Sequence, residues 1–376
     1  MAAPAVRSGP RERGALSDAA GVVILGGCAV WSLVAAAGRE ARPEGVLLAV
    51  LAVAGSYACG RICGSLLPVA AASAAACGAL ALAVLLHPDH GLPGDLPGAA
   101  ASRSFGSTGA TAALLALAAG AACCAAWAAR PRGLRVALRL LALLVAVTGL
   151  VLGSVAGFAA ALGVLLCSLA AARLRRRGAG LAGFALAAGL VVGGSWAVAE
   201  DALPHGLRVS LEGQLTVNRV QLWRDALDLA EEHPLRGAGP DRFGRLSPTA
   251  QQAPHSVGKP HSAPLQLAAE QGVVGVALLG AAFGWMLYGL WRSPRETPVV
   301  LTAAAALTAV AALAGVGNAL SFTAVTAGAG VLAGLSTARR LSDDGGGGAT
   351  RASGVPTAKA PPLGRWPRVP TGRPFP

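Results

Sequence analysis

Residues 109–129, GATAALLALAAGAACCAAWAA, form an unbroken apolar stretch without a single charged side chain. An α-helix rises about 1.5 Å per residue, so a helix of this length crosses the roughly 30 Å hydrocarbon core of a bilayer. Similar stretches recur along the 376-residue chain, which is 54% hydrophobic, only 13% charged, and has a mean hydropathy of +0.58. The sequence therefore predicts an integral membrane protein.

Two features favour helices over a membrane β-barrel. Aromatic residues make up only 4% of the chain, too few for two aromatic girdles, and the apolar stretches do not alternate with polar residues. We expect an all-α polytopic membrane protein with about ten transmembrane helices. The predicted spans are residues 19–37, 45–60, 66–87, 109–129, 137–152, 154–172, 181–199, 272–291, 298–316 and 322–338.

The arginines predict the orientation of these spans. With a cytoplasmic N-terminus, sixteen arginines fall on the inner side and only Arg39, Arg42 and Arg103 fall in short outer segments. The positive-inside rule then predicts a multi-pass plasma-membrane protein with both termini in the cytoplasm and a retained signal-anchor as its first span. The inner arginines are Arg7, Arg11, Arg13, Arg61, Arg130, Arg132, Arg135, Arg139, Arg173, Arg175, Arg176, Arg177, Arg292, Arg295, Arg339 and Arg340.

Charge and cysteine content exclude two other classes of partner. The formal net charge of +13 comes from arginines that end apolar runs, where they serve membrane insertion, so it does not indicate a nucleic-acid partner. All seven cysteines lie in apolar stretches without a histidine at metal-ligand spacing. They are predicted to be packing residues, and we expect neither a disulfide framework nor a metal site.

The spans divide the chain into four parts. Residues 1–199 form an N-terminal bundle of seven spans, and residues 272–338 form a C-terminal group of three. Between them, residues 200–271 form a long extracytoplasmic loop that holds four of the six histidines, so chemistry is expected there. Residues 339–376 are rich in glycine and proline and are predicted to be a disordered cytoplasmic tail.

Within the long loop, residues 216–232 (TVNRVQLWRDALDLAEE) have the periodicity of an amphipathic helix, with Val220, Trp223 and Leu227 on one face. Pro234 ends this helix, because the residue before a proline avoids the α region. Two interpretations remain open: an ordinary packed surface helix, or an interfacial helix that guides a lipid substrate.

A second helix is predicted to begin near Pro264, with His261 just before it and Glu270 inside it. A histidine there can act as a general base near neutral pH, or it can be a plain surface residue. Glu270 can satisfy loop amides or snorkel at the interface. The turn at residues 237–243 (GAGPDRF) can bind phosphate through its amides and Arg242, or it is merely a turn.

Two segments together resemble the paired signature of the O-antigen ligase-like membrane protein family. They are RVQLWRDALDLAEEHPLRGAGPDRF (219–243) and HSAPLQLAAEQGVVG (261–275). The family signature reads R-x3-W, then hP-x-x-G-x-G-x-x-x-F, then H-N-x-x-L-x-x-x-x-E-x-G-x-x-G. The residues that match in type and order are Arg219, Trp223, His233, Pro234, Gly237, Gly239, Phe243, His261, Leu265, Glu270, Gly272 and Gly275.

The resemblance implies a membrane-embedded glycosyltransferase. Its donor would be a glycan on a polyprenyl diphosphate such as undecaprenyl diphosphate, and its acceptor a hydroxyl of a glycan, lipid or protein outside the membrane, without a nucleotide sugar, cofactor or required metal. Carried over by position, His261 would activate the acceptor hydroxyl and Arg219 would contact the diphosphate leaving group. The further candidates for substrate binding are Arg103, Trp223, Arg224, Arg242 and Glu270.

The chain also departs from the family pattern. Ser262 replaces the usual asparagine after the histidine, residues 105–109 (FGSTG) stand where members often read FGNxN, and the hairpin at residues 152–155 lacks an arginine. The choice between ligase and polymerase remains open, as do a small-solute or anion transporter and a non-catalytic member of a polysaccharide assembly complex. No charged residue lies at the centre of a predicted span, which favours the transferase over the transporter.

Overall fold

The computed structural model describes residues 10–87, 97–174, 176–200, 217–252 and 258–339, all within one compact unit, Met1–Arg340. These residues form helices and connecting turns, and no β-strand occurs among them. The predicted all-α polytopic fold is therefore confirmed. The predicted tail from residue 340 onward, and the loop histidines His205 and His255, lie outside the described residues.

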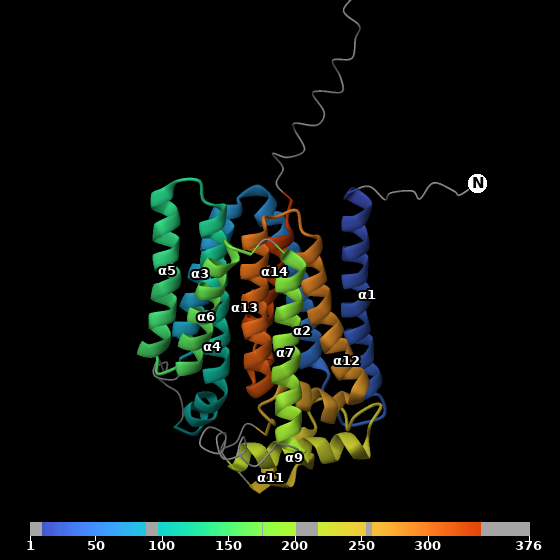
Figure 1. Ribbon diagram of the computed structural model, residues 1–376. Coiled ribbons are helices and arrows are strands. Elements are labelled where there is room, and N and C mark those ends of the chain that lie inside the picture. The colour runs from blue at the N-terminus through green and yellow to red at the C-terminus, as the bar shows by residue number, and fades with distance from the viewer. Residues whose placement is uncertain (1–9, 88–96, 175, 201–216, 253–257, 340–376) are drawn as a thin grey trace, which may run out of the picture. The chain divides into compact units, whose positions relative to one another are not determined.

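Ten long helices follow the ten predicted spans (Figure 1). They are α1 (Pro10–Ala36), α2 (Glu44–Leu66), α3 (Pro68–Leu85), α4 (Pro97–Ala128), α5 (Arg132–Val151), α6 (Val155–Ala171), α7 (Arg177–Ala199), α12 (Ala263–Arg292), α13 (Thr297–Val316) and α14 (Thr323–Thr337). Four other elements accompany them: α9 (Val217–Glu232), α10 (Phe243–Leu246), α11 (Pro248–Gln252) and the 3₁₀ turn η1 (Ala319–Ser321).

Eight of the long helices in the described ranges are long and apolar enough to cross a membrane, rather than about ten. The two exceptions are α6, with 17 residues, and α14, with 15. Both begin within one residue of the predicted spans at 154 and 322. Ser154 caps α6 by accepting a hydrogen bond from the Gly157 amide at 3.1 Å, and η1 occupies the residues just before α14.

Several helices extend beyond the apolar runs that predicted them. Helix α4 begins at Pro97 instead of residue 109, and α5 begins at Arg132 instead of residue 137. Hydropathy detects only the apolar part of a helix, whereas arginine is itself a good helix former and continues the helix past the apolar run.

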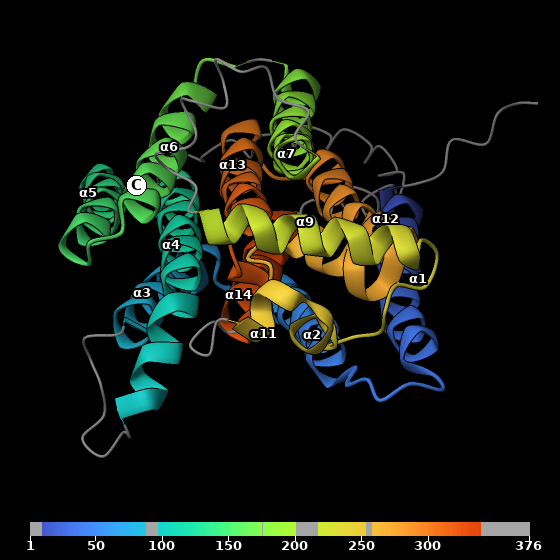
Figure 2. The same ribbon diagram turned by 90° about the horizontal axis from the view of Figure 1, so that it is seen from below.

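Helices α4 and α13 form the centre of the bundle and are the most completely buried spans (Figure 2). Both are rich in alanine, and such small side chains let helix backbones approach closely. Small residues also let α2 and α14 approach each other closely. A Cβ atom added at Gly60 would overlap the carbonyl oxygen of Val331, and one at Gly334 would overlap that of Tyr57. The two backbones are therefore in direct contact.

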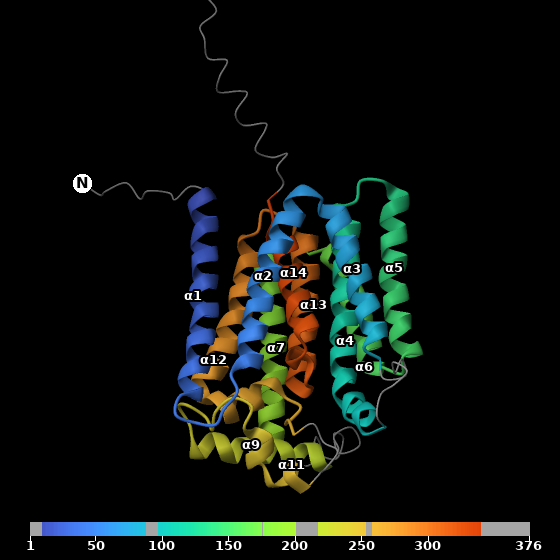
Figure 3. The ribbon, with the colours of Figure 1, turned by 180° about the vertical axis from the view of Figure 1, so that it is seen from behind.

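The two ends of the bundle differ. Helices α9 and α11 lie across one end, together with the start of α12; we call this the His261 end (Figures 1 and 3). The start of α1 and the end of α14 lie at the opposite end. We call that the arginine end, because its helix termini carry Arg132, Arg177, Arg292 and Arg339. The candidate catalytic residues and the arginines that predict the orientation therefore lie at opposite ends of the bundle.

Candidate active site

Helix α9 covers residues 217–232, within one residue of the predicted 216–232, and packs its apolar face against the start of α12. The buried cluster between them contains Leu222, Trp223, Ala226, Leu227, Phe243, Leu265 and Ala269. Both halves of the family signature contribute to this cluster. Packing therefore brings together two segments that the sequence separates by the rest of the loop.

Trp223 fixes the backbone just before His261. Its side chain is only 1% exposed, and its indole N–H donates a hydrogen bond to the carbonyl oxygen of Pro260 at 2.7 Å. His261 itself has φ +53°, a left-handed conformation that few residues with a side chain adopt. Such strain persists only where the surroundings hold the residue in place. The buried indole is thus placed to position His261 rather than to offer an open surface for a substrate.

His261 lies half-buried immediately before α12, beside two cations. Burial lowers the pKa of its imidazole, and the nearby positive charges of Arg219 and Lys259 lower it further. Both effects disfavour the charged imidazolium. His261 is therefore neutral at pH 7 and able to accept a proton.

Arg219 lies in the first turn of α9 and is also half-buried. Burial lowers the pKa of its guanidinium, although an arginine remains charged at neutral pH. Within the described part of the chain it forms neither a hydrogen bond nor a salt bridge to a carboxylate. A partly desolvated cation without a carboxylate partner is well suited to bind an anion.

The Gly-rich turn after α9 is bonded to α12 through the backbone. The amides of Ala238 and Gly239 donate to the carbonyl oxygens of Ala269 and Glu270 at 2.7 and 2.9 Å. The amide of Val273 donates back to the carbonyl oxygen of Pro234 at 2.9 Å. The H-P-x-x-G-x-G and E-x-G segments of the signature are therefore two sides of one interlocked structure.

Glu270 lies beneath this turn and is 4% exposed. Its carboxylate accepts a hydrogen bond from the Gln266 side chain at 3.3 Å and another from the backbone amide of Asp241. Of the two roles open from the sequence, these contacts fit the binding of a loop amide. Lys259 is close enough to interact electrostatically with both Glu270 and His261.

Gly272 breaks α12 at the place where the eighth span was predicted to begin. It has φ +69° and ψ −168°, and an added Cβ atom would overlap the carbonyl oxygen of Leu235. Only glycine adopts this conformation readily. The break lets the first part of α12 lie against α9 while the second part runs along the bundle.

We expect Gly272→Ala to destabilise the protein by about 1–3 kcal/mol, the usual cost of a strained backbone conformation. Gly280→Ala is the matched control, because Gly280 lies in the same helix and an added Cβ would meet no atom within 4 Å. The apparent melting temperature of the purified protein in detergent measures both. Equal melting temperatures for the two variants would show that the break at Gly272 is not required.

The remaining predicted arginines lie in different surroundings. Arg242 groups with Arg39 and Arg236, whose positive charges interact with each other at the end of α1. All three donate to backbone carbonyls: Arg39 to Gly237 at 2.5 Å, Arg242 to Ala238 at 3.0 Å, and Arg236 to Val34 at 2.5 Å. Arg224 is exposed on α9, and Arg103 lies in α4, where its side chain is outside the described part of the structure.

Sequence reasoning missed two cations near the site. Lys259 stands two residues before His261, where no motif marks it. In the sequence, Arg39 indicates only the orientation of the spans. The side chain of Ser262, at the usual asparagine position, is 1% exposed, and its hydroxyl has no hydrogen-bond partner among the described residues.

These features define a class: an all-α polytopic membrane protein with a histidine and two cations at one end of its bundle. A family model described as O-Antigen ligase matches residues 140–280, from within α5 to within α12. The resemblance to the O-antigen ligase-like family, whose members are membrane ligases and glycosyltransferases, is thereby confirmed. A comparison with curated proteins finds no match. The matched range includes His261, Arg219 and Lys259.

Proposed function

We propose that this protein transfers a glycan from a polyprenyl diphosphate carrier to an acceptor hydroxyl at the His261 end of the bundle. The observation that carries this proposal is the placement of a neutral, half-buried histidine beside Arg219 and Lys259, within the region that matches the O-antigen ligase family. A base next to cations is what a reaction with a hydroxyl nucleophile and an anionic leaving group requires.

The proposed step forms one bond and breaks another at the same carbon. The acceptor oxygen attacks the anomeric carbon of the donor glycan, and the bond from that carbon to the diphosphate oxygen breaks. His261 takes the proton that the acceptor hydroxyl loses. The diphosphate leaves with the bonding electrons, so its negative charge grows during the step.

Arg219 supports the departure of the diphosphate. Its planar guanidinium offers paired N–H donors to phosphate oxygens, and its partial burial strengthens that interaction relative to water. Lys259 adds a second positive charge close to His261. We assign Arg219 and Lys259 to the leaving group and His261 to the acceptor.

A gene deletion tests the proposed function directly. In cells that lack the protein, the polyprenyl diphosphate-linked glycan should accumulate in the membrane, and the glycan attached to its acceptor should disappear. Reintroducing the parental protein should reverse both changes. Unchanged levels of lipid-linked and transferred glycan after deletion would contradict the proposal.

The lowered pKa of His261 predicts the pH profile of transfer. Because the neutral imidazole is the active form, kcat/KM should fall on the acid side with a midpoint below the ordinary histidine pKa of about 6.5. Lys259→Gln removes one cause of the lowered pKa, so the acid limb should move to higher pH. Lys259→Arg keeps the charge and should leave the limb in place. If the acid limb of the pH profile lay at the same pH in both variants, Lys259 would not influence the pKa of His261.

The arginine asymmetry predicts that the His261 end faces outward and the arginine end faces the cytoplasm. Two exposed positions at opposite ends, Gln251 on α11 and Gly133 on α5, report on this orientation. In a cysteine-free background, a membrane-impermeant thiol reagent added to intact cells should label Gln251→Cys but not Gly133→Cys. The reverse pattern would show that the orientation is inverted.

A further inference from the structure

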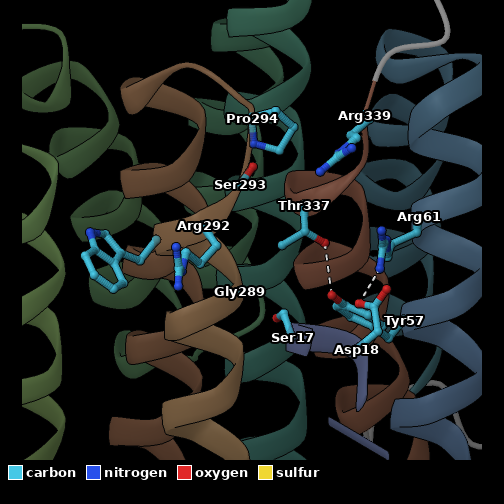
Figure 4. A pocket seen from close by; sticks show the side chains of 11 residues that line it. Ser17, Asp18, Tyr57, Arg61, Gly289, Arg292, Ser293, Pro294, Thr337 and Arg339 are labelled. Carbon is cyan, nitrogen blue, oxygen red and sulfur yellow. Dashed lines mark hydrogen bonds and ion pairs between the residues drawn. The ribbon is translucent and has the colours of Figure 1, made fainter. Parts of the chain in front are cut away.

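A pocket of about 450 Å³ lies at the arginine end, away from the candidate active site (Figure 4). Its walls come from α1, α2, the end of α12 and the end of α14. This volume falls within the roughly 300–1,000 Å³ typical of pockets for small ligands. The side chains that characterise it are Asp18, Tyr57, Arg61, Arg292, Thr337 and Arg339.

The lining of this pocket is positively charged. Three arginines stand against one aspartate, a formal charge of +2. The single carboxylate, Asp18, is already paired with Arg61, as the dashed line in Figure 4 shows. Arg292 and Arg339 are both exposed at the rim. The positive charge of Arg292 therefore lies where an anion can approach it.

Arg292 is held in place by its neighbours. Its Nε donates to the hydroxyl of Tyr288 at 3.0 Å, and its guanidinium lies over the rings of Tyr288 and Trp291, with the central carbon 5.3 and 5.5 Å from the ring centroids. These contacts restrain the guanidinium before any ligand arrives. A restrained arginine loses less side-chain entropy when it binds a phosphate.

Hydroxyl groups complete the inner wall. The Thr337 hydroxyl donates to the Tyr57 hydroxyl at 3.3 Å, and the Tyr57 ring packs on Trp285 with centroids 4.9 Å apart. The close contact between α2 and α14 fixes both residues. The inner wall thus presents the hydroxyl groups of Thr337 and Tyr57, and the Tyr57 ring is supported by Trp285.

The surroundings of the pocket favour a lipid over a free anion. Trp291 is 52% exposed beside Arg292, and Ile62 is 60% exposed beside Arg61, on helices that are long and apolar enough to span a membrane. Exposed aromatic residues next to arginines are typical of the headgroup region of a bilayer. Basic pockets between transmembrane helices bind anionic lipid headgroups. An acyl chain can extend along the apolar surface while its phosphate occupies the pocket.

We infer that this pocket binds a phosphate group, carried by an anionic phospholipid whose headgroup lies between Arg61, Arg292 and Arg339. The inference does not depend on the proposed transfer reaction, because the pocket and the candidate active site lie at opposite ends of the bundle. The ligand would therefore contribute to stability or assembly in the membrane rather than to the reacting groups.

Native mass spectrometry of the full-length protein in detergent tests this inference. The probes are phosphatidylglycerol and phosphatidylcholine with the same acyl chains, each titrated into delipidated protein. We expect phosphatidylglycerol to bind more tightly by about tenfold or more. The double variant Arg292→Gln/Arg339→Gln should weaken that binding by about thirtyfold, or about fivefold for each arginine near a charged lipid.

The matched control is Arg130→Gln/Arg132→Gln, which removes the same charge from exposed positions between α4 and α5, outside the pocket. It should change phosphatidylglycerol binding by less than about twofold. Equal losses in the two double variants would overturn the inference, because only overall charge would matter. Equal affinities of the parental protein for both lipids would also overturn it. So would displacement of phosphatidylglycerol by millimolar inorganic phosphate, which would show a site for free phosphate.

Discussion

His261→Ala should slow glycan transfer by about 10²- to 10⁴-fold, which is the usual contribution of a general base. The loss is expected because His261 is neutral and held in a left-handed conformation by the loop that Trp223 anchors. Arg219 and Lys259 both interact electrostatically with His261. A transfer assay with purified protein in nanodiscs measures the effect, and donor binding measured in parallel should be nearly unchanged.

His255→Ala is the control for this variant. It removes a histidine six residues upstream, outside the matched motif, and should cost little activity. If His261→Ala transferred glycan at the parental rate, the histidine would not be the base, and the proposed step would be wrong even if the deletion result held.

Arg219→Ala should reduce transition-state stabilisation by about 2–4 kcal/mol, the range seen on loss of one preorganised donor to a developing negative charge. Arg219→Lys should also be poor, because lysine retains the charge but loses the planar pair of donors. The reason lies in the partial burial of Arg219 and in its lack of a carboxylate partner among the described residues. Measured kcat and KM for a polyprenyl diphosphate-linked donor give the effect.

Arg245→Ala provides a matched loss of one arginine from the same loop. Arg245 is exposed; it donates to the backbone carbonyl oxygen of Glu40 at 2.5 Å and approaches the Glu40 carboxylate at 3.7 Å. Exposed contacts of this kind contribute little, so its removal should have little effect on transfer. Full activity in both Arg219 variants would show that the matched arginine has only a structural role.

The sequence predicted the helices well because long apolar runs and helical periodicity are local signals. The helix at 217–232, its end before Pro234, and the start of α12 near Pro264 were all confirmed. The extent of the helices was less predictable. Apolar runs do not show how far a helix continues into polar or charged residues, as the starts of α4 at Pro97 and of α5 at Arg132 illustrate.

The composition of the site was only partly predictable, because it depends on contacts between segments distant in sequence. The sequence placed Trp223 on an apolar face but could not show that its N–H reaches Pro260, 37 residues away. Nor does the sequence indicate that Arg39 lies near Arg242. The two come close only because the end of α1 meets the turn after α9. Lys259 lacked a signal for the same reason.

The backbone hydrogen bonds between residues 234–239 and 269–273 have a consequence for the design of chimeric proteins. Each segment supplies carbonyl oxygens to the other's amides, and Gly272 provides the room that the Leu235 carbonyl occupies. A chimera that exchanges only one of these segments with a relative would pair two surfaces that did not evolve together. We expect specificity to be transplanted only when both segments are grafted jointly, however far apart they stand in the gene.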